Sequence, residues 1–384
     1  MANNDNVEIS FLGAGDCGPC GPETADFPIG RYTELVRPVL QSVDLRFGNC
    51  ERQYSREVSR LSVSAHGCQP PEMAQIFFDA GFDALTIANN HMYDHGAEAL
   101  FDTRNIMLEH GIQLTGAGKD LDEARAPAIV KRKGVKVGFL GYCSILDKGH
   151  MPPNAEAGPG KPGIAILRVN TTYENRGPHA SVRIRTEPDE RDLKMIIEDV
   201  AALRKRVDVV MVAFHWGVGW LPRVIADYQV TVGHACIDAG ADLIMGHHPH
   251  IPKAVEMYKG KAIFYSLGNF CKTKPGGPNA AWKEAPWVHG AVRNHIDLDP
   301  DYPMLPHSAD SKRSLLVKAI LTKDGVKRVS FLPMMIDTLY RPEVLHHSDP
   351  RFDDITNYMK WTSEGFDTSF CVEGDEVVIT SASI

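Results

Sequence analysis

Apolar residues recur along the chain in short blocks, and most blocks end in a polar or glycine-rich stretch. Short alternating or continuous apolar runs are typical of strands, whereas apolar positions three and four apart are typical of helices. We expect strands over residues 7–12, 44–47, 83–88, 128–130, 135–142, 207–214, 241–245, 255–258, 262–265, 315–321 and 326–332. We expect helices over residues 32–41, 71–80, 97–109, 190–206 and 227–239.

The order of these elements indicates the fold class. Strands and helices alternate through most of the chain, and three pairs of strands are expected to form hairpins, at Gly134, Gly260 and Gly325. This rhythm predicts an α/β protein with either a mixed sheet or two stacked sheets, with helices outside. Polar residues gather after the strands, which is where α/β folds build their sites.

Two stretches rich in glycine and proline interrupt the pattern. Residues 146–186 and 272–312 are expected to be irregular insertions, able to act as lids, with one strand near 164–169. They would interrupt a single domain over residues 1–340. Residues 341–384 are expected to be a C-terminal extension packed on the same domain.

Composition narrows the class of protein. The 384 residues are 43% hydrophobic and 23% charged, as in soluble globular proteins. A net charge of -8 argues against nucleic acid or an anionic membrane as a partner. The polar start is unlike a secretory signal, and no apolar run approaches the ~20 residues of a membrane span. We therefore expect a cytoplasmic protein, with homo-oligomerisation left open.

The eight cysteines are expected to be mostly free thiols in such a protein. Cys17 and Cys20 have the spacing of a thioredoxin-type redox pair. In such a pair the first cysteine opens a helix, which lowers its pKa. No clear helix begins here, because a second proline follows at position 22, so a redox role is disfavoured.

The densest candidate for chemistry is the stretch 246–250, which follows an apolar strand. It holds His247, His248 and His250, with Gly246 allowing a sharp turn and Pro249 stiffening it. Neutral imidazole is the commonest protein ligand for metals. The sequence therefore predicts that this loop contributes to a metal site, unless its histidines are only exposed loop residues.

Four other strand ends also carry side chains of the kinds that bind metals. Together the five stretches hold Asp16, Asn49, Glu51, Asn90, His91, Asp94, His215, His247, His248 and His250. Carboxylates, an amide oxygen and several imidazoles suit one or two ions of Mn, Fe or Zn, with Mg or Ca as alternatives. Each residue also has a structural explanation. Asp16 could stabilise a turn, Asp94 could cap the next helix, and His215 could be a packed core residue.

These stretches resemble the CapA-type family of capsule synthesis proteins that act in poly-gamma-glutamate production, a branch of the calcineurin-like metallophosphatase fold. The resemblance rests on residues 15–16, 44–51, 88–91 with Asp94 and Gly96, 115–118, 215–217, 246–250 and 265–270, in the family's order. It implies a four-layer α/β/β/α sandwich. It is specific for the family and says little about the substrate beyond implying a small molecule or a peptide- or polyglutamate-like polymer.

The resemblance also implies individual roles. One metal would be held by Asp16, Glu51 and His250, and the other by Glu51, Asn90, His215 and His248. His91, oriented by Asp94, would be the general acid. The residues expected to support these ligands or to contact substrate are Asn49, His247, Trp216, Asn269, His289 and His295. One departure matters: metallophosphatases of this fold usually carry a histidine two residues after the first aspartate, where this chain has Gly18. A single-metal site is therefore an alternative.

Three functions follow from this reading. The leading hypothesis is a metal-dependent hydrolase of a phosphoester or of a γ-glutamyl or peptide amide, in which His91 protonates the leaving group and the metal activates water. The second is a metal-dependent peptide epimerase, since a soluble protein resembling this family performs that reaction in lasso-peptide maturation. The third is a non-catalytic subunit of capsule or polymer biosynthesis.

Overall fold

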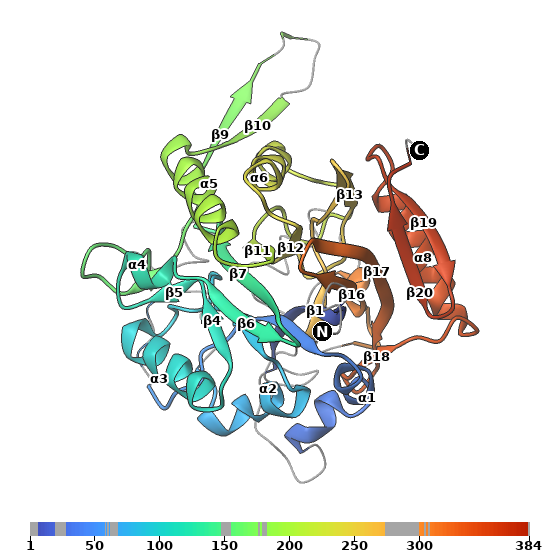
Figure 1. Ribbon diagram of the computed structural model, residues 1–384, viewed down its shortest axis with the longest axis horizontal. Helices are drawn as coiled ribbons and strands as arrows, with labels where there is room; N and C mark the ends of the chain where they lie inside the picture. The colour runs from blue at the N-terminus through green and yellow to red at the C-terminus, as the bar shows by residue number, and fades with distance from the viewer. Residues whose placement is uncertain are drawn as a thin grey trace, which may run out of the picture.

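The structure is a computed structural model. It describes residues 7–19, 28–57, 59, 61, 68–146, 155–175, 177–178, 183–272, 299–302, 305 and 308–382. Two large sheets lie at the centre of these residues, with helices on their outer faces (Figure 1). Among the described helices, none has both the length and the apolar character needed to cross a lipid bilayer.

The first sheet has ten strands and carries the N-terminal strand in its middle. Its order is β19-β20-β17-β16-β1-β2-β3-β4, with β15 also paired to β1 and β18 to β17. The strands are β1 (Ile9–Gly18), β2 (Leu45–Cys50), β3 (Ala84–Thr86), β4 (Gln113–Thr115), β15 (Asn269–Lys272), β16 (Arg313–Thr322), β17 (Gly325–Ile336), β18 (Pro342–Val344), β19 (Ser369–Glu373) and β20 (Glu376–Thr380). Strands β1 to β4 are parallel, and β1 is antiparallel to β16.

The second sheet has six strands in the order β13-β14-β12-β11-β7-β6. They are β6 (Ala128–Arg132), β7 (Val135–Cys143), β11 (Val209–His215), β12 (Leu243–His247), β13 (Val255–Tyr258) and β14 (Lys261–Phe264). Strands β7, β11, β12 and β14 are parallel, and the two outer strands each form a hairpin with the strand that follows. All three hairpins expected from the sequence are present.

Three apolar cores separate four layers. Successive residues of one strand point into different cores. Phe11 of β1 packs between the two sheets, whereas Leu12 packs toward α1 (Arg37–Gln41), α2 (Gln75–Ala80) and α3 (Gly96–Glu109). In the second sheet, Met211 faces the first sheet and Val212 faces α5 (Glu190–Arg204) and α6 (Asp227–Asp238). This is the alternation that strand geometry requires. The expected α/β/β/α sandwich is confirmed.

Some elements differ from the sequence prediction. The stretch expected to be irregular contains β8 (Gly163–Ile164), paired with β5 (Ala117–Gly118), and the ribbon of β9 (Val169–Glu174) and β10 (Arg183–Pro188). That ribbon projects from the body of the molecule beside α5 and α6 (Figure 1). Most of its side chains are exposed on both faces, so its sequence lacks the apolar alternation of a half-buried strand.

The chain after residue 341 also contributes regular structure. Helix α8 (Pro350–Thr362) places Phe352, Ile355 and Met359 in the core between the sheets, and β20 extends the first sheet by pairing with β17. Most of the second expected insertion, residues 273–298, lies outside the described residues.

A buried lysine joins the segment that follows β12 to the segment that follows β11. Lys253 is fully buried, and its Nζ donates hydrogen bonds to the carbonyl oxygens of Val218 at 2.5 Å and Val224 at 2.7 Å. Burial lowers the pKa of Lys253 to about 7. An exposed lysine of the unfolded chain has a pKa of about 10.4, so the two states bind different numbers of protons between these values.

We predict that Lys253 makes stability depend on pH. Between about pH 7 and pH 10 the unfolded chain holds a proton that the folded protein has released. The free energy of unfolding should therefore rise with pH, by up to about 1.4 kcal/mol per pH unit. Urea unfolding across this range measures the free energy of unfolding of the wild type and of Lys253→Met. The wild type should gain stability relative to Lys253→Met as the pH rises. Lys131→Met, at an exposed position of β6, is the control. A constant difference between wild type and Lys253→Met would contradict the prediction.

Candidate metal centre

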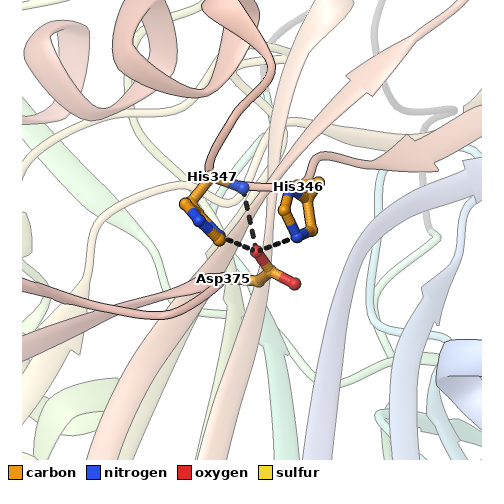
Figure 2. Close-up of side chains that lie close together, drawn as sticks. All are labelled: His346, His347 and Asp375. Atoms are coloured by element: carbon orange, nitrogen blue, oxygen red, sulfur yellow. Dashed lines mark hydrogen bonds and ion pairs between the residues drawn. The ribbon is translucent and has the colours of Figure 1, made fainter.

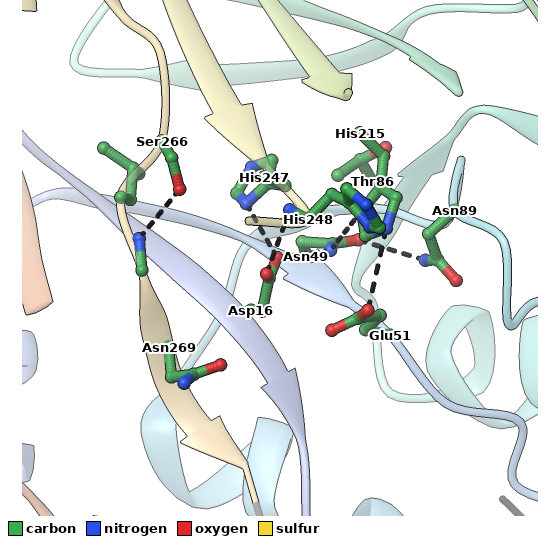
Figure 3. A network of polar contacts seen from close by, with 12 residues as sticks. Asp16, Asn49, Glu51, Thr86, Asn89, His215, His247, His248, Ser266 and Asn269 are labelled. Atoms are coloured by element: carbon green, nitrogen blue, oxygen red, sulfur yellow. Dashed lines mark hydrogen bonds and ion pairs between the residues drawn. The ribbon is translucent and has the colours of Figure 1, made fainter. Parts of the chain in front are cut away.

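The candidate ligands converge where parallel strands of both sheets end. Asp16 lies in β1 beside Asn49 of β2, and in the other sheet His215 ends β11 beside His247, which ends β12. Figure 3 shows these side chains facing one another. The sequence placed Asp16 and Asn49 in loops after short strands, which is wrong: β1 and β2 continue through them, with a register shift between residues 13 and 16. Glycines at 13, 15 and 48 hid this continuation from the apolar pattern.

Asp16 is the centre of the first group of contacts. Its Oδ1 accepts a hydrogen bond from Asn49 Nδ2 at 2.8 Å and lies 3.2 Å from His247 Nδ1. Its Oδ2 accepts one from the His248 backbone N–H at 3.0 Å and lies 3.2 Å from His250 Nδ1. Burial opposes ionisation of this carboxyl, but the imidazoles of His247 and His250 outweigh it, so its pKa lies well below the usual value. Asp16 therefore lies in a strand with its carboxylate directed at the histidines of residues 246–250.

Glu51 is the second buried carboxylate, and it offers a test of whether the residues fit a metal. No described residue donates a hydrogen bond to its Oε1, which lies 3.6 Å from both His215 Nε2 and His250 Nε2. Two donors about 2.1 Å from one ion at the tetrahedral angle lie roughly 3.4 Å apart. One ligand atom each of Asp16, Glu51 and His250 also falls within 4.8 Å of the others. The spacing and the donor types fit a divalent ion.

His215 joins this cluster to the turn after β3. Its Nε2 lies 2.8 Å from Asn90 Oδ1, and its Nδ1 lies 3.3 Å from Asn49 Nδ2. Asn49 Oδ1 accepts a hydrogen bond from Asn89 at 3.1 Å (Figure 3). Burial lowers the pKa of His215 well below its usual value, and His248 adds to this effect. His215 is thus a neutral imidazole, which is the form that binds metals.

His91 and Asp94 form a dyad beside Asn90. His91 Nδ1 lies 2.8 Å from Asp94 Oδ2, and its Nε2 lies 3.4 Å from Asn90 Nδ2. Burial lowers the pKa of His91, and Asp94 opposes the shift. Helix α3 has His95 at its N-cap and no side-chain capping bond, so the alternative explanation that Asp94 caps this helix does not hold. The family resemblance implied that Asp94 orients His91, and the two side chains are in contact.

The loop of residues 246–250, here called the histidine loop, has a strained backbone. His248 has a φ of +95° and His250 a φ of +58°, values that non-glycine residues seldom adopt. Strain of this kind persists where the surroundings over-determine it, which is common at functional sites. Here the hydrogen bond from the His248 backbone to Asp16 and the contact between His250 Nδ1 and Asn269 Oδ1, at 3.0 Å, fix the turn.

The sequence did not identify Lys272 as a candidate site residue. This residue ends β15 and is almost fully buried; its Nζ donates a hydrogen bond to Glu51 Oε2 at 2.6 Å and lies 3.0 Å from His250 Nε2. An ammonium group therefore stands among the expected ligands. No periodic signal in the sequence marks it, because its place depends on the parallel pairing of β15 with β1.

The remaining expected residues fall into three groups. Asn269 supports the histidine loop, with Nδ2 donating to the carbonyl oxygens of His250 and Ser311 at 3.1 Å each. Trp216 is stacked on Phe214 in the core between the second sheet and its helices, on the side away from the ligands. His289 and His295 lie outside the described residues.

The environment of Cys17 does not favour redox chemistry. Cys17 lies in β1 and not at the start of a helix, and Cys20 lies outside the described residues. Burial raises the pKa of the Cys17 thiol well above its usual value, with Cys271 and Cys50 adding to the shift. Reactive cysteines have a lowered pKa.

A second cluster of ligand-type side chains lies on the surface. His346, His347 and Asp375 are exposed and close together (Figure 2). Asp375 Oδ1 accepts a hydrogen bond from the His347 backbone at 2.8 Å and contacts His347 Nδ1 at 2.9 Å. These contacts explain the arrangement without a metal, so the buried cluster is the candidate site.

Comparison with known proteins gives a family match. A family model described as "Bacterial capsule synthesis protein PGA_cap" matches residues 19–274, two thirds of the chain. The "PGA biosynthesis protein CapA" of Bacillus subtilis is 28% identical over 284 residues, 70% of this chain and 64% of that protein. A "Probable polyglutamine synthesis accessory protein" of Mycobacterium tuberculosis is 32% identical over 187 residues, 48% of this chain and 43% of that protein. The match spans less than two thirds of each of these relatives.

Solved structures give more distant similarities. A hypothetical protein from Thermus thermophilus aligns with a TM-score of 0.45 and 14% identity, covering 85% of this chain and 98% of that one. The calcineurin-like phosphoesterase YfkN from Bacillus subtilis aligns with a TM-score of 0.41 and 14% identity, covering 93% of this chain and 96% of that one.

We predict that the histidine loop depends on glycine at 246. A Cβ there would lie 2.1 Å from the carbonyl oxygen of Tyr265, on the backbone of the segment after β14. Gly246→Ala should therefore lower the free energy of unfolding by at least about 1–3 kcal/mol, the usual cost of overpacking. Gly219→Ala, where a Cβ would meet nothing within 4 Å, is the matched control. Urea unfolding measures both, and equal stability of the two variants would contradict the prediction.

Proposed function

Since the chain belongs to the family of bacterial capsule synthesis proteins, we propose that it is a metal-dependent hydrolase acting on a phosphoester or on a peptide or γ-glutamyl amide. One observation carries the proposal: the buried His91–Asp94 dyad adjoins Asn90, whose amide oxygen lies among the ligand-type side chains. An acid–base pair beside a cluster able to hold a cation is the arrangement that hydrolysis needs.

The ligand roles remain those that the family resemblance implies. The resemblance implies two positions for a divalent ion, one at Asp16, Glu51 and His250 and the other at Glu51, Asn90, His215 and His248, with a single occupied position as the alternative. Mn, Fe or Zn would suit this mixed set of oxygen and nitrogen donors. Such an ion, when bound, lowers the pKa of water and polarises a substrate oxygen.

His91 is placed to handle the proton of the leaving group. Its Nδ1 contact with Asp94 fixes the ring, which leaves Nε2 on the side of Asn90 and the ligands. Burial lowers the pKa of His91, so the free site favours the neutral ring. A negative charge on the substrate beside Nε2 would favour the imidazolium and so load the proton that His91 then donates. Asp94 stabilises that charged form.

The names of the relatives suggest the substrate class. Proteins of Bacillus subtilis and Mycobacterium tuberculosis that this chain resembles are named for biosynthesis of PGA and for synthesis of polyglutamine. We infer that the substrate is a peptide-like or polyglutamate-like polymer, or a small precursor of it. The second of these names contains the word "accessory", which favours a second candidate: a non-catalytic subunit that binds the polymer.

We predict that His91→Gln lowers kcat/KM by roughly 10²–10⁴-fold while metal content stays unchanged. Glutamine retains a polar group of similar size but cannot deliver a proton. The measurements are steady-state hydrolysis of aryl phosphate esters and γ-glutamyl anilides, and metal content by mass spectrometry. His110→Gln, at an exposed histidine stacked on Phe78, is the control for the substitution itself. Wild-type turnover in His91→Gln would refute the acid role.

We predict that His248→Ala loses bound metal and turnover together, because it removes an imidazole from beside His215, with ring centres 5.0 Å apart. Full activity of chelator-treated protein would refute metal dependence.

Repeating the assay in deuterated water separates the reaction classes. Exchange at a substrate α-carbon without bond cleavage would indicate epimerisation, and binding of polyglutamate without any reaction would indicate the accessory role.

A further inference from the structure

Lys272 occupies the place where a second cation would be expected. Its Nζ contacts Glu51 Oε2 at 2.6 Å and His250 Nε2 at 3.0 Å, and these two residues belong to the buried cluster of Asp16, Glu51 and His250. An ion bound to both of these atoms would lie about 2.1 Å from each. It would therefore compete with the ammonium group for the same lone pairs.

The sheet explains why a lysine fills this place. Lys272 of β15 pairs in register with Gly18 of β1. A Cβ at position 18 would lie 3.1 Å from the carbonyl oxygen of Glu51, so a side chain there would require that backbone to shift by a few tenths of an ångström. The neighbouring strand supplies the long side chain instead, and its ammonium group reaches Glu51 from β15.

The other oxygen of Glu51 lies between two imidazoles. Its Oε1 accepts no hydrogen bond from the described residues and lies 3.6 Å from both His215 Nε2 and His250 Nε2. Asn90 Oδ1 lies 2.8 Å from His215 Nε2. Because Asn49 Nδ2 faces His215 Nδ1, the neutral ring carries its proton on Nε2, which donates to Asn90 Oδ1. An ion bound at Nε2 would require the other tautomer of His215, and it would then meet the lone pairs of Glu51 Oε1 and Asn90 Oδ1.

Charge leads to the same conclusion. Asp16 and Glu51 together supply two negative charges in a space without exposed surface, and Lys272 supplies one positive charge. One divalent ion changes the sum from minus one to plus one, which an anionic substrate or hydroxide can offset. Two ions would bring it to plus three, and burying that much unbalanced charge is costly.

We infer that the site holds one divalent ion, on the His215 side of Glu51, and that the Lys272 ammonium group takes the place of a second ion. This inference rests on the metal dependence proposed above. It makes Lys272 a positioning residue, which acts through Glu51 and His250.

The test is a count of bound metal. The wild type is dialysed against saturating Mn²⁺, and metal per chain is measured by mass spectrometry. Electron paramagnetic resonance then separates an isolated Mn²⁺ from a coupled pair. We expect about one ion per chain, with an uncoupled signal. About two ions with a coupled signal would overturn the inference and leave the proposed hydrolase standing. Absence of bound ions would overturn both.

Variants of Lys272 test whether its positive charge limits the site to one ion. Lys272→Met removes the charge and should bind Mn²⁺ at least about tenfold more tightly, or bind a second ion, because a repelling cation is gone. Lys272→Arg keeps the charge and should retain the wild-type count. Lys312→Met, which removes an ion pair with Asp299 outside the cluster, is the control. If Lys272→Met destabilises the fold, the number of ions bound by the wild type and by Lys272→Arg still tests the inference. A Lys272→Met protein with wild-type affinity and count would contradict the inference.

Discussion

Two carboxylates without exposed surface, Asp16 and Glu51, are the constraint on which the site depends. Taking a carboxylate out of water costs several kcal/mol, which only close partners of opposite charge or hydrogen-bond donors can offset. Asp16 meets this cost with an amide, a backbone N–H and two imidazoles, and Glu51 with the ammonium group of Lys272. The strain at His248 and His250 is tolerated because their positions satisfy Asp16.

Asparagine side chains connect the ligand-type residues of the first sheet to those of the second. Asn89 donates to Asn49, Asn49 donates to Asp16 and contacts His215, and His215 contacts Asn90. Each amide carries a donor and an acceptor, so it can stand between a carboxylate and an imidazole without adding charge. The chain of contacts joins β2 of the first sheet to β11 of the second, and it sets the His91–Asp94 dyad next to the candidate metal position.

The sequence predicted those features that depend on local pattern. The eleven strands and three hairpins expected from apolar spacing are present, and the histidines of residues 246–250 follow from the end of β12. Strands β4, β15, β18, β19 and β20 of the first sheet were not expected. The projecting ribbon of β9 and β10 was missed, because its faces are both exposed and carry no alternation. Helix α8 was missed within the C-terminal extension, although its buried residues Phe352, Ile355 and Met359 recur at helical spacing.

Lys272 was missed for a different reason. Its role depends on which strand lies beside β1, and β1 changes partner along its length, from β16 at residues 9–13 to β15 at residues 16–18. Nothing local to residue 272 encodes that change. The sequence could show that a ligand was absent at Gly18, but only the tertiary pairing shows what stands opposite it.

A lysine in this place also changes what the fold requires of a metal. In a site built only from carboxylates and neutral imidazoles, removing the ion leaves the negative charges repelling one another. Here the ammonium group lies 2.6 Å from Glu51 Oε2, and it is tied to the sheet through β15. Asp16 in turn keeps its bonds to Asn49 and to the His248 backbone. Charge compensation is thus built into the chain, so the arrangement of the dyad and the ligands can persist without metal and be ready to receive it.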